Sequence, residues 1–223
     1  MIDILELNEE VFRFLDGKDL TYTYRKSNAA GRLEQGYWFY GNENYLAVSF
    51  WSGMDWKNRT PNIIFVITYN GLVYLEINVS DSDRKREFVH TNLLHPLALE
   101  IDGRRFKKHY ASNCDMRSAM DLLDDFIRED KRHIDELIKN KAERFFLPGE
   151  EGFSYIDNKE FRQRRNNVYK YHDRKERDND IVERDESYNT EKPSKISSFS
   201  VHDSGPIQFA EMLDIPINTQ WIF

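Results

Sequence analysis

The dipeptide Asn70–Gly71 constrains the fold of this 223-residue chain more than any other feature, because it separates two runs typical of β-strands, NIIFVITY and LVYLEINV. Asn-Gly suits the type I′ turn, in which both central residues need a positive φ. The sequence therefore predicts an antiparallel hairpin at this point. The first run is apolar at successive positions, which indicates a central strand covered on both faces, whereas the second run alternates and fits a half-exposed strand.

Further strand-like runs extend this region from residue 20 to residue 79. LTYTYRK, GYWFY and YLAVSFW are rich in β-branched and aromatic residues, and polar or Gly-containing segments separate them. We expect four or five antiparallel strands here. Beyond them, LALEIDGRRFKKHYA fits either an irregular segment or one more edge hairpin around Asp102–Gly103.

Three segments carry helical patterns. Residues 8–16 place apolar side chains at helical spacing, with Asn8 as the N-cap and Gly17 as the stop. A second helix follows the sheet and ends near Leu94, shortly before a proline. Asp115 caps a third, long amphipathic helix, and we expect its apolar face to pack on the sheet.

The chain divides by composition into three parts. Residues 1–150 have the strands and helices of an α+β domain, a mainly antiparallel sheet with flanking helices. Residues 151–194 lose apolar residues and crowd charges of both signs, so they cannot bury enough apolar surface to offset their ordering entropy. We expect a charged linker or a partly helical connector there. Residues 195–223 return to strand character.

The tail has the only family resemblance in the sequence. KISSFSV, IQFAEMLDI and TQWIF follow one another, and Gly205–Pro206 separates the first two. This order resembles the opening strands of the nucleotide-binding head of RecF/SMC-like ABC-type ATPases, in which an N-F-G-P-I-like turn leads to a strand close to QWIF. The turn here reads Asp203-Ser204-Gly205-Pro206-Ile207, so the usual Asn-Phe is replaced.

The resemblance implies that a phosphate-binding Walker A loop would follow residue 223, because a buried strand fixes where such a loop begins. No G-x-x-x-x-G-K-[ST] pattern occurs within the sequence. We therefore expect an incomplete head that does not hydrolyse ATP by itself, with the remainder of the head as its partner and ATP and Mg²⁺ as cofactors of the parent protein only. The alternative is a C-terminal strand pair that packs back on the N-terminal sheet.

An aromatic run between residues 37 and 59 supplies candidates for ligand or partner contact. Aromatic faces beside cations can stack a base or hold a cationic or peptide group. The candidates are Trp38, Trp51, Trp56, Lys57 and Arg59. Trp56 is the strongest, because its segment reads as a loop, and loops carry binding residues more often than strands do. The alternative is that this aromatic cluster forms core.

A compact basic run supplies candidates for nucleic-acid contact: Arg104, Arg105, Lys107 and Lys108. Lys and Arg bind phosphates, but runs of this kind also occur as solvated faces or as guarded edge strands. RQRR, at residues 162–165, is a weaker patch diluted by acids. The net charge of −7 argues against non-specific nucleic-acid binding by bulk charge.

Nothing in the sequence points to a catalytic or metal-binding residue. A PD-(D/E)xK nuclease needs an E-x-K on a strand, and Glu76 is followed by Ile77 and Asn78 instead. The histidines lack metal-ligand spacing, and the single Cys114 excludes both a disulfide framework and a cysteine-based zinc knuckle. The acidic N-terminus and the lack of a long apolar run predict a cytoplasmic protein that does not enter a membrane.

We therefore expect a recognition or partner-docking module in front of a prokaryotic RecF/SMC-like ATPase head, in a protein of genome maintenance or phage defence. Its partner would be nucleic acid or another protein. Two alternatives stay open at this point. One is a metal-dependent nuclease-like domain fused to the head, and the other is a structural oligomerisation module that forms a homodimer.

Overall fold

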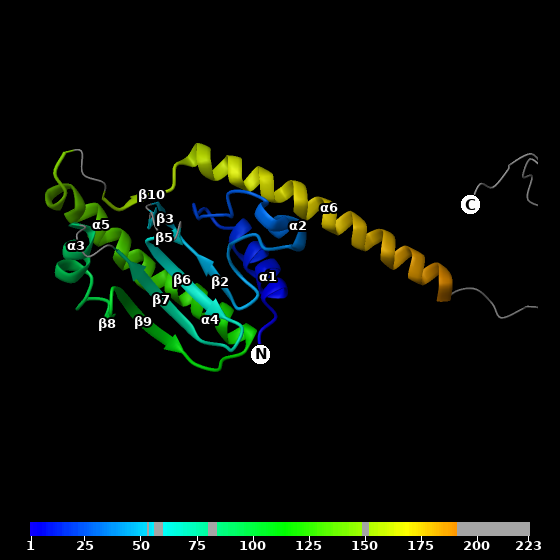
Figure 1. Ribbon diagram of the computed structural model, residues 1–223, viewed down its shortest axis with the longest axis horizontal. Helices are drawn as coiled ribbons and strands as arrows, with labels where there is room; N and C mark the ends of the chain where they lie inside the picture. Colours follow the sequence, from blue (N-terminus) through cyan, green and yellow to red (C-terminus); the bar gives the residue numbers. More distant parts are fainter. Residues whose placement is uncertain (53, 56–59, 80–83, 149–151, 191–223) are drawn as a thin grey trace, which may run out of the picture. The chain divides into compact units, whose positions relative to one another are not determined.

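The computed structural model describes residues 1–52, 54–55, 60–79, 84–148 and 152–190 (Figure 1). The chain divides into two compact units, Met1–Asn179 and Asp180–Phe223. The first unit contains an antiparallel sheet with flanking helices, which confirms the predicted α+β fold. Its last residue lies beyond the predicted domain boundary at residue 150, and the strand-like tail at 195–223 lies outside the described residues.

The main sheet has six strands in the order β1-β2-β6-β7-β9-β8, and every neighbouring pair is antiparallel. The strands are β1 (Tyr40–Asn42), β2 (Tyr45–Val48), β6 (Ile63–Thr68), β7 (Val73–Asn78), β8 (Glu100–Asp102) and β9 (Arg105–Ala111). Two small ladders accompany this sheet. They pair β3 (Trp51–Ser52) with β10 (Ser154–Tyr155), and β4 (Met54–Asp55) with β5 (Thr60–Pro61).

The predicted hairpin is present as β6 and β7, but its turn is not type I′. The Thr68 N–H donates to the Leu72 carbonyl at 3.0 Å, and the Gly71 N–H donates to the Thr68 carbonyl at 2.9 Å. Among the loop residues only Gly71 has a positive φ, +77°. This pattern is the three-residue loop in which a type I turn is followed by a left-handed glycine. The hairpin prediction is therefore confirmed, and the predicted turn type is wrong.

Two runs predicted as strands are mostly not strands. Residues 20–26 form an extended segment that makes isolated backbone bonds, such as Thr23 N–H to the Ser49 carbonyl at 2.8 Å. GYWFY contributes only Tyr40 to a strand, and η1 (Ala29–Gly31) and α2 (Arg32–Gln35) precede it. Most of the β-branched and aromatic residues of these runs are buried without pairing into a ladder, which is why propensity alone predicted the runs wrongly.

Helix α1 (Ile4–Asp16) begins earlier than predicted. Its N-cap is Asp3, whose carboxylate accepts two backbone N–H groups of the first turn at 2.8 and 3.2 Å. Asn8, the predicted cap, lies inside the helix and is buried, and its side-chain oxygen accepts the backbone N–H of Phe39 at 3.2 Å. Gly17 follows the last residue of the helix, as predicted.

The predicted long helix is present, and a π-helical turn interrupts its α-helical geometry. It consists of α4 (Met116–Phe126), η2 (Ile127–Lys131) and α5 (Arg132–Phe145). Asp115 caps it by accepting the Ser118 N–H at 2.8 Å. Its apolar face packs on the sheet as expected, with the Phe126 and Phe65 ring centroids 4.8 Å apart (Figure 1). Helix α3 (Arg84–Asn92) follows β7.

The two faces of the sheet differ. One face joins the main core with residues of the helices. On the other face Ala47, Ile64 and Val66 form a small buried cluster, and the partly buried side chains around it are tyrosines of the strands. Strand β6 is therefore buried on both faces, which confirms its predicted central position.

The segment predicted as a charged linker is largely one helix, α6 (Asn158–Thr190). Asp157 precedes it and accepts the backbone N–H groups of Lys159 and Glu160 at 2.9 and 3.0 Å. The helix as far as Asn179 belongs to the first compact unit, where Val168 is fully buried. No helix in the described part of the chain is long and apolar enough to cross a membrane.

Candidate functional site

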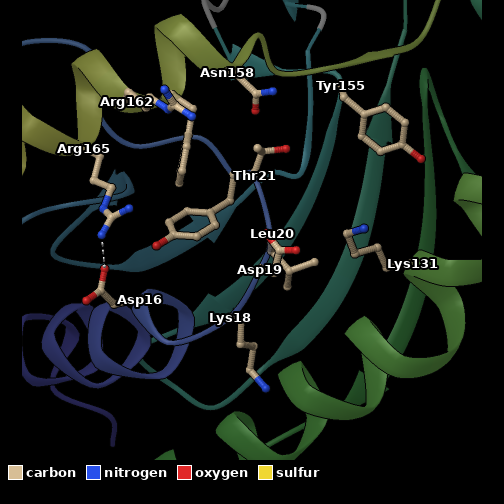
Figure 2. A pocket seen from close by; sticks show the side chains of 12 residues that line it. Asp16, Lys18, Asp19, Leu20, Thr21, Lys131, Tyr155, Asn158, Arg162 and Arg165 are labelled. Atoms are coloured by element: carbon tan, nitrogen blue, oxygen red, sulfur yellow. Dashed lines mark ion pairs between the residues drawn. The ribbon is translucent and has the colours of Figure 1, made fainter.

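A polar pocket of about 450 Å³ lies between the start of α6 and the part of the first compact unit that precedes α6, which we call the body (Figure 2). One wall is the segment 16–22, which follows α1. The other wall is the first turns of α6, and Lys131 and Tyr155 complete the lining. Volumes of this size are typical of small-molecule sites, which span about 300–1,000 Å³.

The chain turn after α1 places the first wall. Gly17 ends the helix, the Lys18 N–H donates to the Leu15 carbonyl at 3.0 Å, and the Leu20 N–H donates to the Lys18 carbonyl at 2.8 Å. The residues from Lys18 to Tyr22 line the pocket on this side. Asp16 then ties the two walls together, because it forms an ion pair with Arg165 at 3.5 Å.

Lys131 is buried at the side of the pocket, and the π-helical turn positions it there. Its ammonium group donates to Asp135 at 2.7 Å. The rings of Phe50, Trp51 and Tyr155 surround it, with centroids 5.4, 5.8 and 6.0 Å from Nζ. Asp135 also accepts the Trp51 indole N–H at 3.0 Å, so both charges of this pair are satisfied within the protein.

Two tyrosines of the lining hold their protons firmly. Burial, followed by the nearby carboxylate of Asp135, raises the pKa of Tyr155 to about 12. Burial likewise raises the pKa of Tyr22 to about 12, and its hydroxyl lies 2.8 Å from that of Tyr24. At neutral pH both phenols are therefore neutral hydrogen-bonding groups and not bases.

Most cations of the lining are already paired. Lys18 contacts Asp124 at 3.2 Å, and Lys131 and Arg165 have the carboxylate partners given above. Four polar side chains of the lining make no hydrogen bond or ion pair with any described residue: Asp19, Thr21, Asn158 and Arg162. The pocket thus offers one unpaired carboxylate and several unpaired donors to a ligand.

The aromatic candidates from the sequence do not form a contact surface. Trp38 is fully buried, and its indole N–H lies 3.4 Å from the Glu9 carboxylate. Trp51 is 1% exposed and belongs to the core beneath the pocket. Both are therefore core residues, and their prediction as contact residues is corrected. The three others, Trp56, Lys57 and Arg59, lie outside the described residues.

The basic candidates are neighbours in space but face two sides of the sheet. Arg104 lies in the turn before β9, and Arg105 and Lys107 point to the face opposite the main core. Lys108 points to the helix-covered side, where it reaches Asp130 at 2.7 Å. A single basic surface built from all four residues, as predicted, is therefore not formed.

Carboxylates neutralise the two basic residues that share a face. Arg105 lies 3.2 Å from Glu76, which is only 5% exposed. Lys107 lies 2.6 Å from Asp102 and 4.0 Å from Glu76. A phosphate would have to compete with these partners, so the geometry does not strengthen the predicted nucleic-acid contact.

Only a weak sequence pattern indicated the pocket. Thr21 lies in the run LTYTYRK, which was predicted as a strand, Asp19 directly precedes this run, and Asn158 and Arg162 lie in the predicted linker. The RQRR patch was the one local pattern that pointed to this place. Within the described ranges, no group of three or more His, Cys, Asp or Glu residues is arranged to hold a metal ion.

No family model, curated protein or solved structure matches this chain. The resemblance to RecF/SMC-like ATPases therefore stays a prediction, and it rests on residues 195–223.

Proposed function

We propose that this chain is a recognition or partner-docking module that precedes a RecF/SMC-like ATPase head in a cytoplasmic prokaryotic protein of genome maintenance or phage defence. The supporting observation is that the first half of α6 packs against the body. That helix leads in sequence to the tail that carries the resemblance. Binding at the body would therefore act on the segment next to the head.

The contacts between α6 and the body are specific. Val168 is fully buried, and the imidazole of His172 stacks on Phe12 with ring centroids 4.6 Å apart. The Arg164 guanidinium donates to the backbone carbonyl of Tyr24 at 3.0 Å. Mixed apolar and polar contacts of this kind fix one position of a helix, because each polar partner loses its hydrogen bond if the helix shifts.

ATP and Mg²⁺ would bind in the head and not in this module. Partners of the complete protein would be the remainder of the head and a nucleic acid or protein that the module recognises. The module itself contributes binding and positioning, and the ATPase supplies the chemistry.

The coding sequence that follows the codon for Phe223 tests the ATPase part of the proposal. We expect it to encode a Gly-rich Walker A loop directly after the QWIF strand. A stop codon or an unrelated continuation would contradict this part.

The coupling through α6 is tested in the joined protein. His172→Ala removes a contact between α6 and the body, so we expect it to change the rate of ATP hydrolysis. Lys170→Ala alters an exposed residue of the same helix and serves as the matched control. Equal rates in both variants and the unchanged protein would contradict the coupling.

A further inference from the structure

We infer that the pocket between α6 and the segment 16–22 binds a nucleoside monophosphate. This inference gives the proposed module a ligand and rests on its recognition role, but it does not depend on the ATPase head. Three features of the lining carry it, taken over the residues that the structure describes: the one unpaired cation, the unpaired carboxylate, and the apolar part of the lining.

Among the described residues of the lining a single cation is unpaired, and this limits the charge of the ligand. Lys18, Lys131 and Arg165 each have a carboxylate within 3.5 Å, so their charge is compensated. Arg162 makes no ion pair or hydrogen bond with the described residues. Its guanidinium can bind a phosphate through two parallel N–H···O hydrogen bonds. One free guanidinium suits one phosphate group, whereas a di- or triphosphate would leave negative charge uncompensated beside Asp16 and Asp19.

Two neutral hydrogen-bonding side chains, Asn158 and Thr21, also line the pocket. Asn158 lies one helical turn before Arg162, and Figure 2 shows both on the α6 side of the pocket. The Thr21 hydroxyl lies on the opposite wall, and neither Thr21 nor Asn158 has a partner within the described residues. An amide and a hydroxyl can complete the coordination of phosphate oxygens that one arginine leaves unsatisfied.

The unpaired carboxylate requires a ligand that also donates. Asp19 is exposed on the wall facing α6 and has no partner among the described residues. A purely anionic ligand would be repelled by this group. A nucleobase carries N–H donors that a carboxylate accepts, so it suits the Asp19 end of the pocket while its phosphate occupies the Arg162 end.

Part of the lining is apolar or aromatic and includes Leu20, Tyr22 and Phe161. Tyr22 is 2% exposed and packs edge to face against the partly buried Phe161, with ring centroids 5.1 Å apart, so Tyr22 supports Phe161 and does not itself offer a ring to a base. The hydrogen bond between the Tyr22 and Tyr24 hydroxyls, 2.8 Å apart, also holds the Tyr22 ring. Aromatic side chains stack planar bases with favourable free energies of about 1–3 kcal/mol. A cavity of about 450 Å³ suits a ligand of mononucleotide size.

Calorimetric titration of the 223-residue chain tests the inference. The probes are AMP, GMP, CMP, UMP, adenosine and inorganic phosphate. We expect at least one monophosphate to bind at least tenfold more tightly than adenosine and than inorganic phosphate. If no monophosphate binds at millimolar concentration, or if inorganic phosphate binds as tightly as every monophosphate, the inference is overturned.

Variants test which residue binds the phosphate and which residue binds the base. Arg162→Gln should weaken monophosphate binding about tenfold or more, since it removes the phosphate contact. Lys170→Gln removes the same charge from α6 outside the pocket and should change the affinity less than twofold. Asp19→Asn should weaken binding of monophosphates but not of inorganic phosphate. Equal losses in Arg162→Gln and Lys170→Gln would show unspecific attraction and would overturn the inference.

The outcome of the binding test does not depend on whether the ATPase proposal is correct. Binding is measured on this chain alone, whereas the head is tested by the coding sequence after Phe223. Circular dichroism of each variant checks folding, and Arg162→Lys supplies a second variant that keeps the charge and loses the bidentate geometry. We expect it to bind with an intermediate affinity, and wild-type affinity in Arg162→Lys would overturn the guanidinium contact.

Discussion

His172 Nε2 of helix α6 lies 2.8 Å from Glu9 Oε1 of helix α1, although 163 positions separate the two residues in the sequence. The same imidazole stacks on Phe12, and the other Glu9 oxygen faces the indole N–H of Trp38 at 3.4 Å. This pair joins the first helix of the domain to the charged helix that follows it. Substitutions at these residues therefore test how strongly α6 is held against the rest of the domain.

His172→Ala should lower the free energy of unfolding by about 2 kcal/mol, because it removes both the ring packing and the hydrogen bond to Glu9. Urea unfolding followed by circular dichroism measures this change. Lys170→Ala, on the exposed side of the same helix, should change the stability by less than about 0.5 kcal/mol. Equal stabilities of the two variants would show that His172 does not hold α6.

The same contact predicts an acid dependence. Burial raises the pKa of Glu9, but its hydrogen bond to His172 and the charges of His172 and Arg13 outweigh that effect, and the net pKa lies below the ordinary value of 4.5. The stabilisation is therefore fully present above pH 4.5 and is lost as the pH falls through the lowered pKa. Urea midpoints measured from pH 7 to pH 3 should fall less steeply in Glu9→Gln. Identical slopes would contradict this assignment.

Local patterns were sufficient to predict the central hairpin and the long helix. Apolar runs on both sides of Asn70–Gly71 fixed β6 and β7, and Asp115 fixed the start of α4. The turn type was not predictable, because the glycine conformation depends on a neighbour from a distant part of the chain: Cys114 donates its backbone N–H to the Gly71 carbonyl at 3.0 Å. The turn type therefore depends on this tertiary contact, whereas the Asn-Gly dipeptide alone indicates only a preference for one turn type.

The pocket was beyond sequence reasoning for a related physical reason. Its walls come from a run with strand propensity and from a charged run that composition assigns to a linker. Whether Arg162 is free and Lys131 is paired depends on which carboxylates lie nearby in space. A charge run that appears solvated in isolation can dock when a few side chains find specific partners, as Val168 and His172 do here.

Lys131 and Asp135 should show strong energetic coupling, because the pair is largely shielded from water and lies among aromatic rings. A double-mutant cycle with Lys131→Met and Asp135→Asn should give about 1–3 kcal/mol of coupling in urea unfolding. The exposed pair of Arg13 and Glu10, 3.4 Å apart on α1, is the matched control and should give less than about 0.5 kcal/mol. Similar coupling for both pairs would show that burial does not strengthen the inner pair.

Two glycines with positive φ allow the energetic cost of backbone strain to be measured separately from the cost of a steric clash. Gly71 and Gly103 have φ of +77° and +58°, so alanine at either position adopts a left-handed conformation that costs about 1–2 kcal/mol. A Cβ at Gly103 meets no atom within 4 Å, whereas a Cβ at Gly71 would lie 2.6 Å from the Cys114 nitrogen. Gly103→Ala should therefore cost only the conformational strain.

Gly71→Ala should cost more than about 3 kcal/mol, because the chain around Cys114 must also move, and that segment leads directly into the Asp115 cap of α4. Urea unfolding of the two variants measures the difference. A loss of similar size in both would mean that the backbone near Cys114 yields to a methyl group at little cost, so the hairpin and the start of α4 would not be rigidly joined.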